Sequence, residues 1–467
     1  MNPIGKMFDV SRMVKKEKQL GEIPSSKEVY QNFLKVAWPS AVEALLVSLV
    51  GFVDTMMVSS LGENAIAAIG ITNQPKFILL AAIFALNVGV TAVTARRKGQ
   101  NDREGANQVF RSAILVCGLI ALVMSTFGFF FAEPLLRFAG AEEIYMQDAI
   151  TYFKILVVSV VFTALNLTVN AAQRGSGNTK ISMRTNVIAN LINVIFNYLL
   201  INGHMGFPKL GVKGAGIATC LCAMVACFVS FLTLCNKKGY LNYSVNARWK
   251  VERSTMQPIL KVSSSAFVEQ IFMRIGFFAY AVIVAKLGVI PYATHLICMN
   301  ILNISFSFGD GFAIAASALV GQNLGSGRQD LSTIYGKTGQ RVAFMASTML
   351  FFVFLFGRYP LLQLFSEDPE VIQLGASILI IMAFTTHMQT SQVVFSGCLR
   401  GAGDSAFVAM TSLISVAIIR PTLTYVLCFP LGLGLHGAWL ALLFDQVFRV
   451  STAAIRFYSG KWARIVL

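Results

Sequence analysis

Five acidic side chains stand inside long apolar stretches of this sequence, where an ionised group is costly. They are Glu43, Asp54, Glu269, Asp310 and Asp445. A carboxylate in hydrocarbon faces an interior cavity, pairs with a cation, or takes up a proton. The chemistry that these residues favour is therefore the binding and release of cations. Ion pairing between helices is the competing explanation for each of them.

Asp54 lies in the motif GFVDT at 51–55 and has no obvious fixed basic partner. We therefore favour a functional role for it. Glu43 stands eleven positions earlier, which is about three helical turns, so we expect both carboxylates on one helix face. For Glu43, a functional role and an ion pair or hydrogen bond, with Arg274 as a candidate partner, both stay open.

We expect different roles for the remaining acids. Asp445 and Arg449 have the i, i+4 spacing of a helical ion pair, and we expect a structural pair there. Asp310 lies between two glycines, which is consistent with an unwound segment that exposes backbone carbonyls. A buried acid with a backbone partner explains Asp310 equally well.

A polar stripe runs along one apolar segment, with asparagines at spacings of four, three and four: Asn186, Asn190, Asn193 and Asn197. Such a stripe in hydrocarbon is either a helix-packing seam or the wall of a wet cavity. Thr219, in the next apolar segment, could approach the same stripe.

These residues must be positioned by membrane helices. The chain of 467 residues is 55% hydrophobic and only 13% charged, about half the charged fraction usual for a soluble protein. Apolar stretches of about 20 residues, the length that crosses a bilayer, recur along it. The predicted fold is an all-α integral membrane protein with twelve spans, at 33–58, 66–95, 109–132, 149–172, 183–203, 212–235, 258–286, 291–320, 339–365, 371–398, 405–429 and 434–456.

The distribution of basic residues predicts the orientation. Most of the 38 lysines and arginines fall at the termini and in the even-numbered connectors. By the positive-inside rule, both termini lie in the cytoplasm of a multi-pass protein of the inner (plasma) membrane. The net charge of +16 therefore needs no nucleic acid partner.

The sequence also contains an internal repeat. Glu43 and Glu269 are separated by the same interval along the chain as Gly62 and Gly288, and as Gly175 and Gly401. One offset shared by separate landmarks indicates duplication into two parallel six-helix bundles. The expected organisation is a cytoplasmic segment 1–32, a first lobe 33–240, a linker 241–257 and a second lobe 258–467.

Enzyme chemistry is not indicated. The four histidines and eight cysteines show no metal-ligand spacing, and the glycine-rich turn at 175–180 lacks the spacing of a phosphate loop. We expect no cofactor beyond a coupling ion.

With these motifs in place, the chain resembles the multidrug and toxic compound extrusion (MATE) family of antiporters from about residue 30 onward. The resemblance rests on Pro39 and on the motifs at 51–55, 61–68, 319–325 and 399–404, in this order. It implies a cation site at Asp54 with Asn193, Asn197 and Thr219, where Asp54 binds H⁺ or Na⁺. Some members carry a second aspartate where this chain has Asn197.

Glu43 and Glu269 are symmetric mates in the repeat, so we expect both to face a central substrate cleft, to which we also assign Asp310 and Gln389. The resemblance matches Glu269 to a span-seven glutamate of several members. Gln389 stands where NorM-type members have a span-ten aspartate, so we expect a bacterial type that lacks it. The implied function is export of amphipathic, cationic small molecules by a lipid-embedded monomer, in exchange for H⁺ or Na⁺. A lipid-linked precursor flippase of the same superfamily is the alternative, and a membrane-embedded enzyme is the alternative from another class.

Overall fold

The computed structural model describes residues 8–235, 239–242 and 249–465. Twelve helices within these ranges are long and apolar enough to cross a membrane, which confirms the predicted fold class. They are α2 (Ser26–Ser59), α3 (Glu63–Gly99), α4 (Arg103–Phe130), α6 (Glu143–Gly175), α7 (Thr179–Asn202), α8 (Gly211–Leu234), α9 (Arg253–Ala285), α10 (Val289–Gly325), α11 (Gln329–Phe356), α13 (Pro369–Ala402), the composite span α14 (Ser405–Ser412), η4 (Leu413–Ile419) and α15 (Arg420–Cys428), and α16 (Gly434–Tyr458).

Most helices extend beyond the apolar stretches that predict them, because their end turns are polar. The ninth span differs most. We expected 339–365, whereas α11 covers Gln329–Phe356 and the chain bends at Gly357 into the short α12 (Arg358–Gln363). Hydropathy detects the apolar part of a helix and misses polar first turns such as that of α11.

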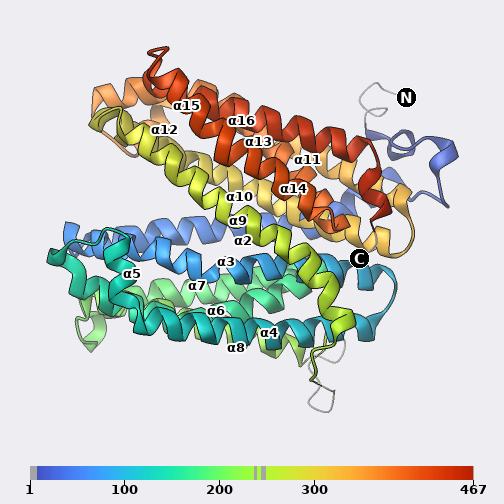
Figure 1. Cartoon of the computed structure of the whole chain (residues 1–467), viewed down its shortest axis with the longest axis horizontal. Coiled ribbons are helices and arrows are strands. Elements are labelled where there is room, and N and C mark those ends of the chain that lie inside the picture. The colour runs from blue at the N-terminus through green and yellow to red at the C-terminus, as the bar shows by residue number, and fades with distance from the viewer. Residues whose placement is uncertain (1–7, 236–238, 243–248, 466–467) are drawn as a thin grey trace. The chain divides into compact units, whose positions relative to one another are not determined.

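The chain divides into two compact units. The first unit contains Met1–Ala44 and Ser264–Leu467, and the second contains Leu45–Ser263. Within the second unit, α3, α4, α6, α7 and α8 pack together (Figure 1). Buried side chains drawn mainly from α3, α4 and α6 form a hydrophobic core there. Within the first unit, α10 and α13 pack closely along their length and are flanked by α11 and α16.

The duplication is visible in the backbone. The equivalent glycines Gly62 and Gly288 cap α3 and α10 with φ of 98° and 107°. Gly175 approaches the backbone of Thr91, and Gly401 approaches that of Ser317, so both repeats share the same close helix contact. A side chain at either glycine would separate the helices, which is why small residues stand there.

The first helix of each repeat is shared between the units, since the unit boundaries fall inside α2 and α9. The segment before α2 packs on the first unit: Arg328 donates to the Glu22 carbonyl at 2.9 Å, and Lys337 donates to that of Met13 at 2.6 Å. Hydrogen bonds with Asp330 raise the pKa of Arg328.

The segment before α9 packs on the second unit in an equivalent way. Arg103 donates to the carbonyls of Gly239 and Tyr240 at 2.6 and 3.1 Å, and Lys98 lies 3.6 Å from the centre of the Tyr240 ring. These contacts attach the start of each repeat to the unit formed mainly by the other one. The lobe limits expected from the sequence stay a prediction.

Candidate functional site

The structure brings Asp54 and the asparagine stripe together inside the second unit. Asn197 donates its amide nitrogen to Asp54 Oδ1 at 2.7 Å and to Asn193 Oδ1 at 3.2 Å. Asn193 and Asn197 are 3% and 2% exposed, and Asp54 is half-buried. The other two asparagines of the stripe, Asn186 and Asn190, are half-buried. α7 thus presents two adjacent turns of amides to the acid on α2.

Further groups from three helices surround Asp54. Lys76 of α3, Tyr152 of α6 and Cys222 of α8 are all close enough to interact with it electrostatically. Thr219 reaches this cluster through a hydrogen bond with Tyr152, while its hydroxyl also donates to the Ala215 carbonyl at 3.0 Å. We call Asp54, Lys76, Tyr152, Asn193, Asn197, Thr219 and Cys222 the Asp54 cluster.

A basic side chain on another helix, Lys76 of α3, interacts electrostatically with Asp54. Lys76 was visible in the sequence as an ionisable residue within a span, but nothing in the spacing linked it to Asp54. Lys76 is half-buried, and Asp54 is the one acid among the groups that perturb it.

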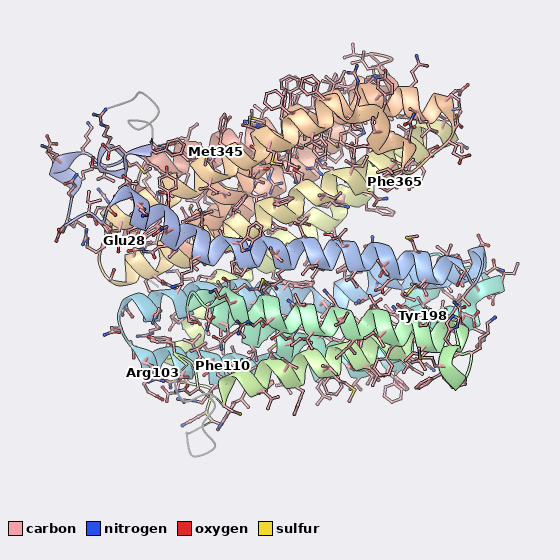
Figure 2. The ribbon with its side chains drawn as sticks, turned by 180° about the vertical axis from the view of Figure 1, so that it is seen from behind. Glu28, Arg103, Phe110, Tyr198, Met345 and Phe365 are labelled. Carbon is pink, nitrogen blue, oxygen red and sulfur yellow. The ribbon has the colours of Figure 1, made fainter. Side chains whose placement is uncertain are left out.

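The cluster lies toward one end of its unit. Figure 2 shows Arg103, at the start of α4, and Tyr198, near the end of α7, at opposite ends of the second unit. Asn197 immediately precedes Tyr198 in α7. The sequence predicts that the basic Arg103 end, opposite the cluster, faces the cytoplasm.

Glu269 of α9 lies in a different environment, in the interior of the first unit. It is 1% exposed and accepts hydrogen bonds from Arg400 Nη2 at 2.7 Å and Ser412 Oγ at 2.9 Å. Arg449 donates to the same Ser412 hydroxyl at 3.2 Å. Glu269 is therefore held in a buried ion pair that joins α9, α13, α14 and α16.

Asp445 does not form the expected pair with Arg449. It is fully buried and forms its ion pair with Arg420, whose Nε lies 3.1 Å from Asp445 Oδ2, and it accepts a hydrogen bond from Ser415. The cause is the π-helical segment η4, in which the backbone N–H of Arg420 bonds to the carbonyl of Ser415 five residues earlier. This wider turn brings Arg420 onto the helix face that carries Ser415.

The other expected cleft residues belong to the first unit. Asp310 is exposed and interacts electrostatically with Arg400. α10 is helical through Asp310, so the unwound-segment interpretation is wrong. Gln389 is 1% exposed, and neither of its amide atoms has a hydrogen-bond partner among the described residues. Glu43 is 7% exposed, and α2 is helical from Glu43 to Asp54.

Comparison with known proteins shows which family the chain belongs to. The MatE family profile matches residues 39–199 and 265–426, one segment in each repeat. The chain belongs to the MATE family. MATE proteins are membrane transporters and not enzymes, and the described residues contain no group of three histidine, cysteine or acidic side chains arranged to hold a metal. Whether this MATE protein is of the type without the span-ten aspartate stays a prediction.

Curated relatives align with most of the MATE chain. It is 25% identical over 446 residues to a probable multidrug resistance protein NorM of Thermotoga maritima, with 95% of this chain and 94% of the relative aligned. It is 26% identical to the multidrug resistance protein PmpM of Pseudomonas aeruginosa, over 80% of this chain and 79% of that one.

Solved structures show the same fold. A MATE crystal structure matches with a TM-score of 0.84 at 21% identity, covering 93% of this chain and 97% of the other. A MATE transporter of Vibrio cholerae matches with a TM-score of 0.85 at 17% identity and the same coverage.

Proposed function

We propose that this MATE protein is a secondary active exporter that exchanges amphipathic, cationic compounds for an inward-moving H⁺ or Na⁺ by alternating access. The relatives named multidrug resistance proteins support the substrate class. The observation that carries the proposal is Asp54, an ionisable acid half-buried inside a membrane bundle and held by Asn197 at 2.7 Å.

The coupling of export to the driving cation follows from the thermodynamic linkage between cation binding and the orientation of the protein. A cation that binds Asp54 more tightly in one orientation than in the other shifts the population of the two orientations by that difference in affinity. The amide groups of Asn193 and Asn197 are short, polar and close to the carboxylate. They can therefore stabilise its charge when it is ionised and remain hydrogen-bonded when it is not.

Export of a fluorescent organic cation from proteoliposomes tests this function. Asp54→Asn keeps the size of the side chain and its hydrogen bonding, so we expect the variant to fold while losing gradient-driven transport. Asp148→Asn is the matched control, because Asp148 is an exposed acid on α6 of the same unit. Wild-type transport by Asp54→Asn, with the same dependence on the driving ion, would reject Asp54 as the coupling residue.

The flippase alternative needs a basic cavity for a pyrophosphate group. Arg400 and Arg420 do lie in the first unit, but each forms an ion pair with an acid, Glu269 and Asp445 respectively. Their charge is largely compensated, so the arrangement favours the exporter. We further propose a plasma-membrane location with both termini in the cytoplasm, small-molecule substrates and a monomeric protein embedded in lipid.

A further inference from the structure

We propose that Arg449 forms, with the polar groups around it, a binding site for a small monovalent anion inside the first unit. The anion is chloride from solution or the carboxylate group of a transported compound. The site goes beyond the proposed exchange of cations and does not depend on the role of Asp54. Two observations carry it, namely the burial of Arg449 without an acid bound to it and the prior pairing of the acids around it.

The first observation concerns Arg449 itself, which lies in the spanning helix α16. Arg449 is 6% exposed, and its one hydrogen bond within the described part of the chain runs from Nη2 to the Ser412 hydroxyl at 3.2 Å. Its buried Nε has no hydrogen-bond partner there. No carboxylate of the described residues lies within ion-pair distance of it. A charged side chain inside a membrane bundle is costly unless an opposite charge compensates it.

The second observation is that the acids which attract Arg449 are already paired. These acids are Asp445 and Glu269. Asp445 forms its ion pair with Arg420. Glu269 forms its own with Arg400, at 2.7 Å. Each pair is balanced internally, and the arginines of both pairs face Arg449 and repel it. The positive charge of Arg449 is therefore in excess within this group.

Two further acids of the first unit leave this excess in place. Asp310 of α10 interacts electrostatically with Arg400 and is exposed, so its charge is screened by solvent. Neither Asp310 nor Glu43 is among the groups that act on Arg449. A bound anion would supply the compensation that the described side chains do not.

The chemistry of the group selects the kind of anion. Guanidinium N–H groups are donors only, and they hold anions through charge-assisted hydrogen bonds. A single excess charge matches a monovalent anion, whereas a pyrophosphate group would need several unpaired arginines. Gln446 lies one helical turn before Arg449 on the same buried face of α16. It is 1% exposed and its Oε1 has no hydrogen-bond partner among the described residues, so its amide can turn its N–H groups toward a bound anion.

Equilibrium binding of radiolabelled anions to the purified full-length protein tests the site. Chloride and benzoate are measured separately, and gluconate, a large and strongly hydrated anion, keeps the ionic strength constant. We expect saturable binding by the wild type. Tighter binding of chloride identifies an anion from solution, and tighter binding of benzoate identifies the carboxylate of a transported compound. A concentration of the bound anion about tenfold above its dissociation constant should raise the thermal unfolding midpoint by about 2 °C.

Substitutions at the site make the test specific. Arg449→Gln removes the charge but keeps a donor for Ser412, so we expect anion affinity to fall at least about tenfold, while Arg449→Lys keeps the charge and should retain binding. Gln446→Glu places a carboxylate beside Arg449, because residues three apart are neighbours on a helix. This variant should lose anion binding and unfold at a higher temperature than the wild type in gluconate. The matched control is Arg464→Gln, at an exposed arginine of the same unit, which should change neither property.

No saturable binding of either anion by the wild type would overturn the inference. Wild-type anion affinity in a folded Arg449→Gln or Gln446→Glu protein would overturn it as well. Size-exclusion profiles establish that each variant is folded, and the isosteric Gln446→Glu decides the question if Arg449→Gln is not. Since the assay measures binding and unfolding rather than export, failure of the proposed exporter function would leave its outcome unchanged.

Discussion

Replacing Glu269 by glutamine distinguishes a structural acid from a substrate-binding one. Glu269 is 1% exposed and pairs with Arg400 at 2.7 Å. Removing one partner of a buried ion pair costs about 3–5 kcal/mol, because the other charge is left uncompensated. The Arg400 side chain is 27% exposed, so water recovers part of this loss, and we expect Glu269→Gln to lower the free energy of unfolding by about 2–3 kcal/mol.

The measurement is unfolding in mixed micelles, followed by far-ultraviolet circular dichroism, with Arg400→Gln and the double variant completing a thermodynamic cycle. Both charges are absent in the double variant, so its loss should be smaller than the sum of the single losses. Glu367→Gln, at an exposed acid of the same unit, serves as the control and should leave stability unchanged. Cation export by the same variants is measured in parallel.

Loss of export without loss of stability would refute the structural role of Glu269. If Glu269→Gln abolished export while its unfolding free energy stayed at the wild-type value, Glu269 would be the cleft acid that the family resemblance implies. Additive single losses would also refute the buried ion pair as the role of Glu269, since Glu269 and Arg400 would then not depend on each other.

Three further predictions concern the first unit. Asp445→Asn should lower the free energy of unfolding by about 3–5 kcal/mol in the same assay, because Arg420 is 1% exposed and is left without its negatively charged partner. Replacing both residues, by Arg420→Met and Asp445→Leu, should restore most of this loss. Gly276→Ala should destabilise by about 1–3 kcal/mol, since a Cβ there would lie 2.7 Å from the carbonyl carbon of Val416 in the π-helical segment. Asp310→Asn should weaken the binding of organic cations in equilibrium dialysis with little change in unfolding, because Asp310 is exposed; unchanged affinity would remove it from the substrate site.

The sequence alone determined the membrane fold. Twelve apolar stretches of spanning length specify twelve helices, because in lipid each helix must satisfy its own backbone hydrogen bonds. The duplication also followed from the sequence, since glycines that cap helices or permit close contact recur at one constant interval. Helix ends were less well determined, as the earlier start of α11 at Gln329 shows, because hydropathy does not mark a polar first turn.

The sequence also singled out Asp54 and the asparagines of α7, but which charges meet was decided by the tertiary structure. Local spacing favoured Asp445 with Arg449, whereas the π-helical segment turns Arg420 toward Asp445 instead. Lys76 interacts electrostatically with Asp54 from another helix, and Arg400 of α13 pairs with Glu269 of α9, which is distant in the sequence. The partner of a buried charge depends on which helix faces pack together and on how each helix is rotated, and the periodicity of a single helix carries no information about the rotation of its neighbour.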